Sequence, residues 1–177
     1  ARGLVLGASI LSILVNPLLF ALAARRMTNP KPGPKAQEPV APQPTKLSDH
    51  AVVVGYGRVG RLLVAGLKDR LPLLVIEEAA LGEIGVEHIR GNGARDDVLK
   101  AANLGRARML LVAIPEAFEA GQIVEKARRA NPALKIVARA HFDAEVEHLK
   151  AHGANDVVMG EREIARAILG LALPAAI

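Results

Sequence analysis

A glycine-rich turn is the feature of this sequence that points most clearly to chemistry. Gly55, Gly57 and Gly60 follow the apolar run 51–54 with the spacing G-x-G-x-x-G, and an amphipathic stretch begins directly after them. In that context the first glycine permits a tight turn, the second lets a phosphate approach the backbone, and the third lets a helix pack closely on the strand. The free N–H groups at the helix start bind the phosphate. The pattern predicts a nucleotide site; a turn that serves packing alone is the alternative.

An acidic residue stands where such a site places the carboxylate for a ribose. Glu77 ends the second apolar run and follows Gly55 by 22 residues, close to the spacing of about 20 expected for this acid. Its carboxylate would accept hydrogen bonds from ribose hydroxyls and would repel a 2′-phosphate, which disfavours NADP. Glu78 points the other way along a strand, and we expect it to face solvent.

Other ionisable side chains have simpler interpretations. One group falls near a single face of a predicted helix: His141, Glu145, His148 and His152. Metal sites need such clustering, but the sequence has no H-E-x-x-H motif, so a solvated helix face is expected. Asp96 and Asp97 most simply begin a helix, where negative charge suits the helix dipole. We predict neither a metal site nor catalytic residues.

The elements that would position these residues alternate between strand and helix. Apolar runs of strand length occur at 50–55, 73–77, 86–90, 109–113, 135–140 and 156–159, and helical periodicity occurs near 59–69, 96–103, 116–130, 142–152 and 161–172. This alternation is typical of a parallel sheet with helices on both faces. We predict an α/β fold, a Rossmann-like doubly wound parallel sheet of six strands. Its core must be aliphatic, because the chain has three phenylalanines, one tyrosine and no tryptophan.

The N-terminal region differs in character from the rest. Residues 3–24 carry no charge and reach the length of about 20 apolar residues that a membrane helix needs. Arg25 and Arg26 come directly after this run, and their positive charge favours a cytoplasmic location for the remainder of the chain. A secretory signal peptide, whose apolar part is typically only about 7–15 residues, and a buried helix of a soluble protein are the alternatives. Because the chain begins with Ala1, we expect it to be a piece of a longer protein.

A proline-rich segment separates the apolar N-terminus from the α/β region. Residues 29–46 hold six of the eleven prolines, and such a segment behaves as a semi-rigid extended spacer. The expected organisation is a transmembrane helix at 1–26, a linker at 27–47 and a Rossmann domain at 48–177.

Charge and cysteine content narrow the possible partners. The net charge of +5 arises in residues 1–46, whereas residues 47–177 hold equal numbers of basic and acidic side chains. A nucleic-acid binder needs a basic face on its folded domain and, for single strands, stacking aromatics, so no nucleic acid is expected as a partner. The absence of cysteine excludes a disulfide framework and thiolate metal sites.

The region from His50 to about Leu173 resembles a known family. The motifs that carry the resemblance are HAVVVGYGRVG at 50–60, GNGA at 91–94, IVARAH at 136–141 and GANDVVMGER at 153–162. They are similar to the TrkA-N, or RCK, domains of Kef-type potassium:proton antiporters, with particular likeness to the YbaL-type branch. The resemblance implies a protein of the bacterial inner membrane whose C-terminal domain is cytoplasmic. Its implied partners are the lipid bilayer and the membrane antiporter domain of the same chain.

The resemblance also implies a ligand and the residues that bind it. The ligand is an adenine nucleotide, either NAD(H) or AMP, ADP or ATP, held between the glycine turn, the acid of the second strand and the loop after the third. The matching residues are Gly55, Tyr56, Gly57, Arg58, Val59, Gly60, Glu77, Gly91, Asn92 and Ala94, with Arg139 as a weaker candidate for phosphate. Two departures matter. Asn92 replaces the acid usual in that loop, and residues 78–90 are short, so we expect a clipped second helix and a more open adenosine side.

These features predict a cytoplasmic nucleotide-sensing domain that regulates a potassium or other monovalent cation:proton antiporter and catalyses nothing. The alternative is a soluble NAD-dependent oxidoreductase with an apolar N-terminal helix. An oxidoreductase needs a substrate pocket, usually from a second domain, and we expect only a terminal helix after the sixth strand.

The assembly of the domain also follows from the resemblance. RCK-like domains work in pairs, so the resemblance implies a homodimer. The last helix supports this, because residues 164–172 are apolar over more than one stripe and a lone surface helix needs one. Packing of that helix on the antiporter or the linker is the alternative.

Overall fold

The computed structural model describes residues 15–17, 19–20 and 42–173 of the chain. The chain divides into two units, Ala1–Val40 and Ala41–Ile177. The described residues of the first unit are helical, but the predicted transmembrane helix and linker lie for the most part outside the described residues. Among the residues that are described, no helix combines the length and the hydropathy that a membrane crossing requires.

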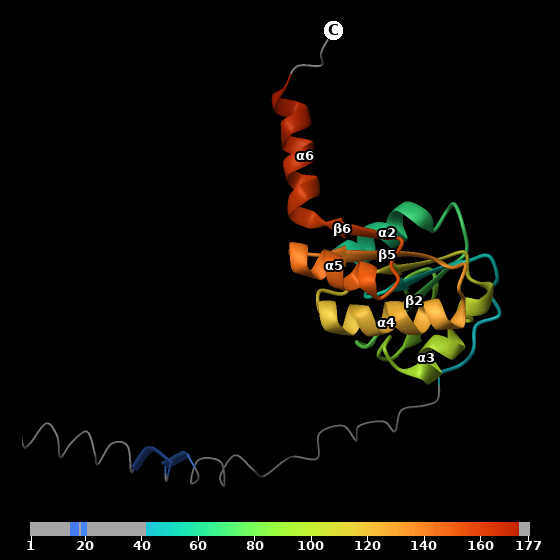
Figure 1. Cartoon of the computed structure of the whole chain (residues 1–177). Helices are drawn as coiled ribbons and strands as arrows, with labels where there is room; N and C mark the ends of the chain where they lie inside the picture. The colour runs from blue at the N-terminus through green and yellow to red at the C-terminus, as the bar shows by residue number, and fades with distance from the viewer. Residues whose placement is uncertain (1–14, 18, 21–41, 174–177) are drawn as a thin grey trace, which may run out of the picture. The chain divides into compact units, whose positions relative to one another are not determined.

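The second unit is built on a parallel sheet of six strands (Figure 1). The strands are β1 (Ala51–Val54), β2 (Leu73–Glu77), β3 (Glu87–Arg90), β4 (Met109–Val112), β5 (Lys135–Ala140) and β6 (Asp156–Met159). Their order in the sheet is β3-β2-β1-β4-β5-β6, and each neighbouring pair is parallel. The chain therefore winds outward in both directions from β1 and β4. This arrangement confirms the predicted Rossmann-like, doubly wound fold.

Helices cover the two faces of this sheet (Figure 1). They are α2 (Arg58–Leu67), α3 (Asp96–Ala101), α4 (Ala117–Ala130) and α5 (Asp143–Ala151), with a short 3-10 helix, η1 (Leu104–Arg106), after α3; a further helix, α6 (Gly160–Ala172), follows β6 and does not cover the sheet. On one face Val64 of α2 packs with Val53 of β1. On the other face side chains of α3, α4 and α5 pack with Val52 and Val54. Because both faces are covered, the central strands are continuous apolar runs rather than alternating ones.

The connection between β2 and β3 differs from the prediction. Residues 78–86 contain no helix, so the clipped second helix that we expected is absent rather than shortened. The segment is shorter than the dozen or more residues that a parallel crossover with a helix usually takes. Three apolar side chains, Leu81, Ile84 and Val86, instead pack from this loop onto the α2 side of the sheet.

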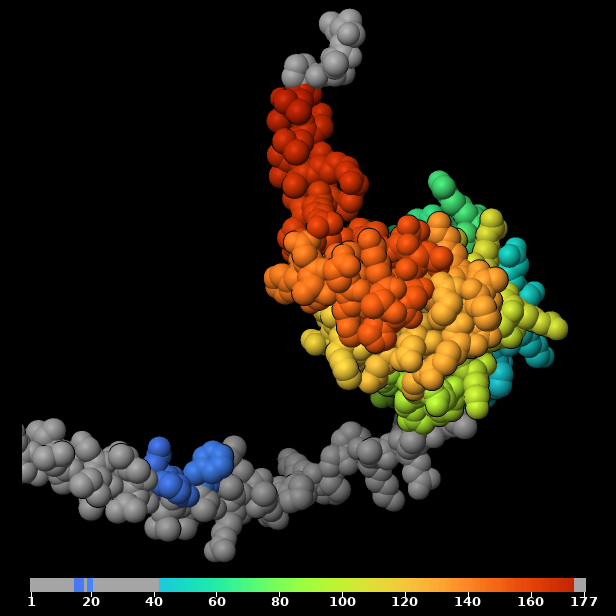
Figure 2. Space-filling view, viewed as in Figure 1, coloured from blue at the N-terminus to red at the C-terminus, as the bar shows by residue number. Residues whose placement is uncertain are grey.

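Helix α6 leaves the sheet and stands apart from the other helices of its unit (Figure 2). None of its residues is buried, and Ile164, Ile168 and Leu171 are between 60% and 90% exposed. The strand before it is also poorly covered, since Val158 of β6 is exposed. An apolar helix and an apolar sheet edge are thus both left without cover within the described chain.

Candidate functional site

The turn between β1 and α2 has the geometry that its glycines predict. Gly55 has a φ of +93°, a left-handed conformation that side chains rarely adopt. A Cβ on Gly60 would overlap the carbonyl oxygen of Gly55, so only glycine lets α2 approach the turn this closely. Gly57 caps the start of α2, and a Cβ there would meet nothing within 4 Å. The helix start therefore presents open space in front of its free N–H groups, as phosphate binding requires.

Glu77 at the end of β2 is tied to this turn. Its Oε2 accepts a hydrogen bond of 2.6 Å from the backbone N–H of Tyr56, and its Oε1 accepts one of 3.0 Å from the N–H of Ala79. The half-buried carboxylate is thus fixed by two backbone groups and retains further lone pairs for a ligand. The arrangement places the carboxylate of Glu77 directly beside the glycine turn, at the position that the predicted nucleotide site needs.

A cavity of about 740 Å³ opens at this point, where the winding direction of the sheet reverses between β1 and β4. Ligands of open α/β sheets bind at such switch points, and the volume is within the usual range for ligand sites. Seven of the predicted residues line it: Gly55, Gly57, Arg58, Val59, Glu77, Gly91 and Arg139. The four others do not: Tyr56, Gly60, Asn92 and Ala94. Tyr56 and Gly60 shape the turn, and Asn92 and Ala94 shape the loop after β3.

The cavity also has lining residues that the sequence did not indicate. They include Glu78, Gly93, Ile114, Pro115, Glu116, Glu119 and His141. Most of them follow β4 or β5 at the carboxyl edge of the sheet, where doubly wound sheets bind their ligands, so the predicted fold could have indicated them. Glu78 is exposed, as expected, yet it also borders the cavity.

Two glutamates on the acidic side of the cavity are joined by Asn92. The Nδ2 group of Asn92 donates to Oε1 of Glu78 at 2.6 Å and to Oε1 of Glu119 at 2.8 Å. Its Oδ1 accepts from the backbone N–H of Ala94 at 2.7 Å. The asparagine that replaces the expected acid therefore links the end of β2, the loop after β3 and the first turn of α4.

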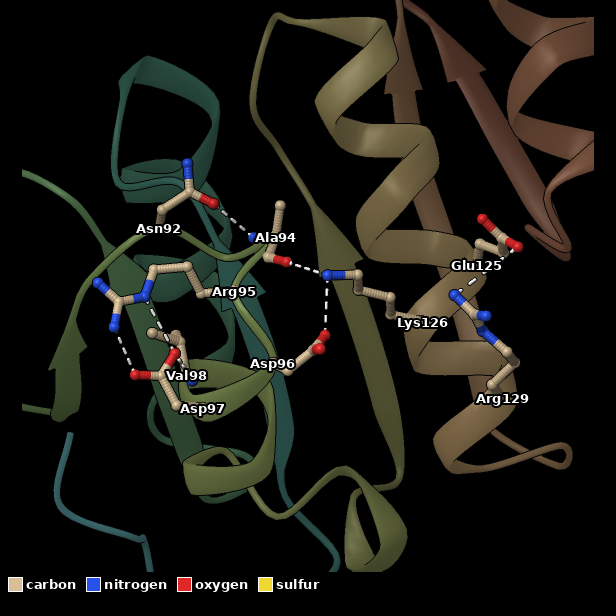
Figure 3. A network of polar contacts seen from close by, with 9 residues as sticks. All are labelled: Asn92, Ala94, Arg95, Asp96, Asp97, Val98, Glu125, Lys126 and Arg129. Carbon is tan, nitrogen blue, oxygen red and sulfur yellow. Dashed lines mark hydrogen bonds and ion pairs between the residues drawn. The ribbon is translucent and has the colours of Figure 1, made fainter. Parts of the chain in front are cut away.

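Lys126 of α4 fixes the same loop from its other side (Figure 3). Its Nζ donates to the carbonyl of Ala94 at 2.6 Å and lies 2.8 Å from Oδ1 of Asp96. The hydrogen bond from Lys126 holds the pKa of the Asp96 carboxyl below its ordinary value, and the hydrogen bond from Arg95 does the same for the pKa of Asp97. Both aspartates begin α3, as the sequence predicted.

The opposite side of the cavity is basic. Arg58 is the first residue of α2, and Arg139 near the end of β5 lies with its Nη2 2.6 Å from Nε2 of His141. The backbone N–H of His141 donates to Oε2 of Glu145 at 2.7 Å. The cavity is thus lined both by carboxylates, which can accept from ribose hydroxyls, and by the arginines Arg58 and Arg139, which suit the phosphate of a nucleotide.

The predicted histidine face separates into two parts. His141 belongs to the cavity, whereas the rings of His148 and His152 lie against each other at the end of α5, with their centroids 4.2 Å apart and their planes tilted by 44°. Within the described part of the chain, no group of three or more histidine, aspartate or glutamate side chains is arranged to hold a metal ion.

Comparison with known proteins identifies the same region as a domain. The profile of the TrkA-N domain family matches residues 51–160. The chain is 43% identical over 181 aligned residues to the cation/proton antiporter YbaL of Escherichia coli strain K12, an alignment that covers 96% of this chain and 32% of that protein. The chain thus spans about a third of the length of this relative. The predicted resemblance to the TrkA-N domains of Kef-type antiporters is confirmed.

Solved structures agree with this match. The crystal structure of the TrkA-N domain of the inner membrane protein YbaL from Escherichia coli has a TM-score of 0.70 and 46% sequence identity, and the alignment covers 73% of this chain and all of that one. The C-terminal domain of Kef from Shewanella denitrificans, in an AMP-bound form, has a TM-score of 0.63 and 27% identity, with 71% of this chain and 82% of that chain covered.

Proposed function

The chain belongs to the TrkA-N domain family, and we propose that the cavity at its glycine turn binds an adenine nucleotide. The observation that supports this proposal best is the hydrogen bond from the N–H of Tyr56 to Glu77, which holds a carboxylate beside the start of α2, where a ribose and a phosphate would be neighbours. The AMP-bound form of the related Kef domain supports an adenine nucleotide as the ligand.

The glycine turn and Glu77 set the proposed orientation of the nucleotide. The phosphates lie at the start of α2, with Arg58 and Arg139 on the same side of the cavity. The ribose hydroxyls donate to Glu77, and the base extends toward the loop after β3. An AMP, ADP or ATP molecule would occupy the part of the cavity between the start of α2 and the loop after β3. The second nucleotide of NAD(H) would continue past β4 toward Arg139. A 2′-phosphate would face the carboxylate of Glu77, so NADP is a poor ligand.

We assign the domain a regulatory role in a monovalent cation:proton antiporter of the inner membrane, with potassium as the cation. The match to YbaL over nearly the whole chain supports this role. Residues 1–26 form its last membrane helix, residues 27–47 form a linker, and the Rossmann domain lies in the cytoplasm. The domain itself catalyses no reaction.

The end of the linker is attached to the same helix that begins at the nucleotide loop. The backbone N–H of Thr45 donates to the carbonyl of Ala101 at 2.9 Å, and the side chain of Asn103 donates to the carbonyl of Leu47 at 3.0 Å. Helix α3 begins at Asp96, two residues after Ala94, and ends at Ala101. A nucleotide that moves the loop would therefore move the linker, provided that it binds the two arrangements with different affinities.

We further propose that two copies pair through α6. The apolar stripe of this helix is exposed to solvent. A second exposed apolar surface is a groove of about 200 Å³ on the α2 side of the sheet, which is lined by Leu63, Leu111, Val137 and Val158. If each copy places α6 over the groove of the other, both surfaces are buried about one two-fold axis. Paired domains then change their arrangement together when the nucleotide binds.

Mass spectrometry of the small molecules that co-purify with the 177-residue chain tests the proposed ligand directly. An adenine nucleotide at a stoichiometry near one per chain is expected, and calorimetry with AMP, ADP, ATP, NADH and NADPH then ranks the candidates. If no adenine nucleotide binds at millimolar concentration, the proposal fails. Steady oxidation of NADH with simple carbonyl substrates would instead support the oxidoreductase alternative.

A further inference from the structure

The acidic side of the cavity holds a pair of carboxylates that the glycine motif does not explain. Glu78 follows β2 and Glu119 lies in the first turn of α4, yet both accept a hydrogen bond from the same amide nitrogen of Asn92. Among residues 42–173 neither carboxylate has a basic side chain within ion-pair distance. Two negative charges are thus held together at the cavity wall by a neutral amide.

The orientation of Asn92 results from its own hydrogen bonds. Its Oδ1 accepts from the N–H of Ala94, so its Nδ2 group faces the glutamates and supplies one N–H to each. An aspartate at this position would bring three carboxylates together and offer them no donor. Asn92 therefore serves to hold Glu78 and Glu119, and its polar atoms are engaged within the protein.

The place of this pair in the cavity indicates what it would contact. With the phosphates at the start of α2 and the ribose at Glu77, the base lies further toward β3, where Glu78, Gly91 and Glu119 line the wall. Each carboxylate has lone pairs that Asn92 does not use, and a carboxylate can only accept hydrogen bonds. The exocyclic amino group of adenine donates hydrogen bonds, whereas guanine carries an acceptor oxygen at the same ring position.

We propose that Glu119, held by Asn92 together with Glu78, is the residue that selects a 6-amino purine over a 6-oxo purine in this cavity. This inference rests on the proposed binding of an adenine nucleotide and adds the group that recognises the base. In this chain the acceptor for the base comes from α4, because the amide at position 92 is engaged with the glutamates. A 6-oxo purine would place its oxygen against a carboxylate and leave both acceptors without a donor.

The test compares AMP with inosine monophosphate, which differs from AMP at the 6-position by an oxygen in place of the amino group. Calorimetry on the 177-residue chain should give a preference for AMP of about tenfold or more, the effect of one hydrogen bond to a charged group. The Glu119→Gln variant should lose most of that preference, since its amide can also donate to a 6-oxo group. Glu125→Gln is the matched control, because Glu125 lies on the same helix, pairs with Arg129 at 3.7 Å and does not line the cavity.

The possible results separate this inference from the proposed function. If the native chain binds AMP and Glu119→Gln keeps the native preference, the role of Glu119 is wrong and nucleotide binding stands. If the native chain binds AMP and inosine monophosphate with equal affinity, the role of Glu119 is likewise wrong and nucleotide binding stands. If the native chain binds neither, both proposals fail. Should Glu119→Gln not fold, Glu119→Ala takes its place, and a native preference for AMP in that variant overturns the role of Glu119.

Discussion

The backbone N–H of Tyr56 donates a 2.6 Å hydrogen bond to Oε2 of Glu77, and this contact joins the glycine turn to the end of the neighbouring strand. The register of the sheet makes it possible, because Val54 pairs with Ile76, the residue before the acid. The carboxylate is therefore positioned before a ligand arrives. A group that is already ordered loses little conformational entropy on binding, which favours affinity.

Replacing Glu77 with alanine should weaken adenine nucleotide binding. The ribose would lose its acceptor, and the N–H of Tyr56 would lose its partner, so the cost should be about 1.5–3 kcal/mol, as for other hydrogen bonds to charged groups. The same variant should narrow the difference in affinity between NADH and NADPH, because the charge that repels the 2′-phosphate is gone. Calorimetry measures both effects. Unaltered affinity for both dinucleotides would place the ribose elsewhere.

Gly57→Asp should abolish nucleotide binding and leave the domain folded. A side chain at Gly57 meets nothing in the protein within 4 Å but enters the cavity where the phosphate must lie, and it carries a negative charge. Gly82→Asp is the control, since it adds the same charge in an exposed loop that does not line the cavity. Circular dichroism checks the fold and calorimetry the affinity. A folded Gly57→Asp protein with native affinity would contradict our placement of the phosphate.

Two glycines of α2 should respond to alanine in opposite ways. A methyl group on Gly60 would overlap the carbonyl of Gly55, so Gly60→Ala should lower the free energy of unfolding by about 1–3 kcal/mol, as overpacking does. Gly66 is exposed with open space around it, so Gly66→Ala should raise the free energy of unfolding by about 0.5–1 kcal/mol. Urea denaturation of the two variants gives both values. Equal effects would mean that the turn and α2 do not pack as described.

The ion pair between Lys126 and Asp96 should be visible in the titration of the aspartate. Because the pKa of Asp96 is lowered in the folded protein, its contribution to stability is present at neutral pH. That contribution is lost as the pH falls from about 4, the ordinary value, through the lowered pKa. In Lys126→Met the Asp96 carboxyl should titrate closer to its ordinary pKa, and in the control Lys150→Met on α5 it should not. NMR titration of the carboxyl carbon measures the difference, and identical curves in all three proteins would exclude the pairing.

The proposed pairing through α6 depends on its apolar stripe. Ile168→Glu puts a charge at the centre of the stripe and should convert a dimer into a folded monomer. Gly170→Glu adds the same charge on the opposite side of the helix and should leave the dimer intact. Light scattering on the 177-residue chain at tens of micromolar, with and without AMP, tests the pairing. A native chain that is monomeric in both conditions would contradict it.

The sequence by itself determined the scaffold of the site. The apolar runs, the helical periodicity and the spacing from Gly55 to Glu77 predicted six strands, their partner helices and the glycine turn, since each depends on residues close together in the chain. The positive φ of Gly55 and the close approach at Gly60 are backbone requirements that only glycine meets. Such requirements are visible in residue type alone.

The tertiary structure decided which side chains meet at that scaffold. Glu119 is an ordinary glutamate in an amphipathic helix until the crossover from β4 brings the start of α4 beside Asn92. The missing helix between β2 and β3 and the uncovered α6 likewise depend on which surfaces have room and which find a partner. The strands, the helices and the glycine turn follow from local sequence patterns, because backbone conformation is restricted by steric contacts between residues close together in the chain. Contacts between distant elements arise only from how the sheet is wound, which places residues from five separate segments at one edge.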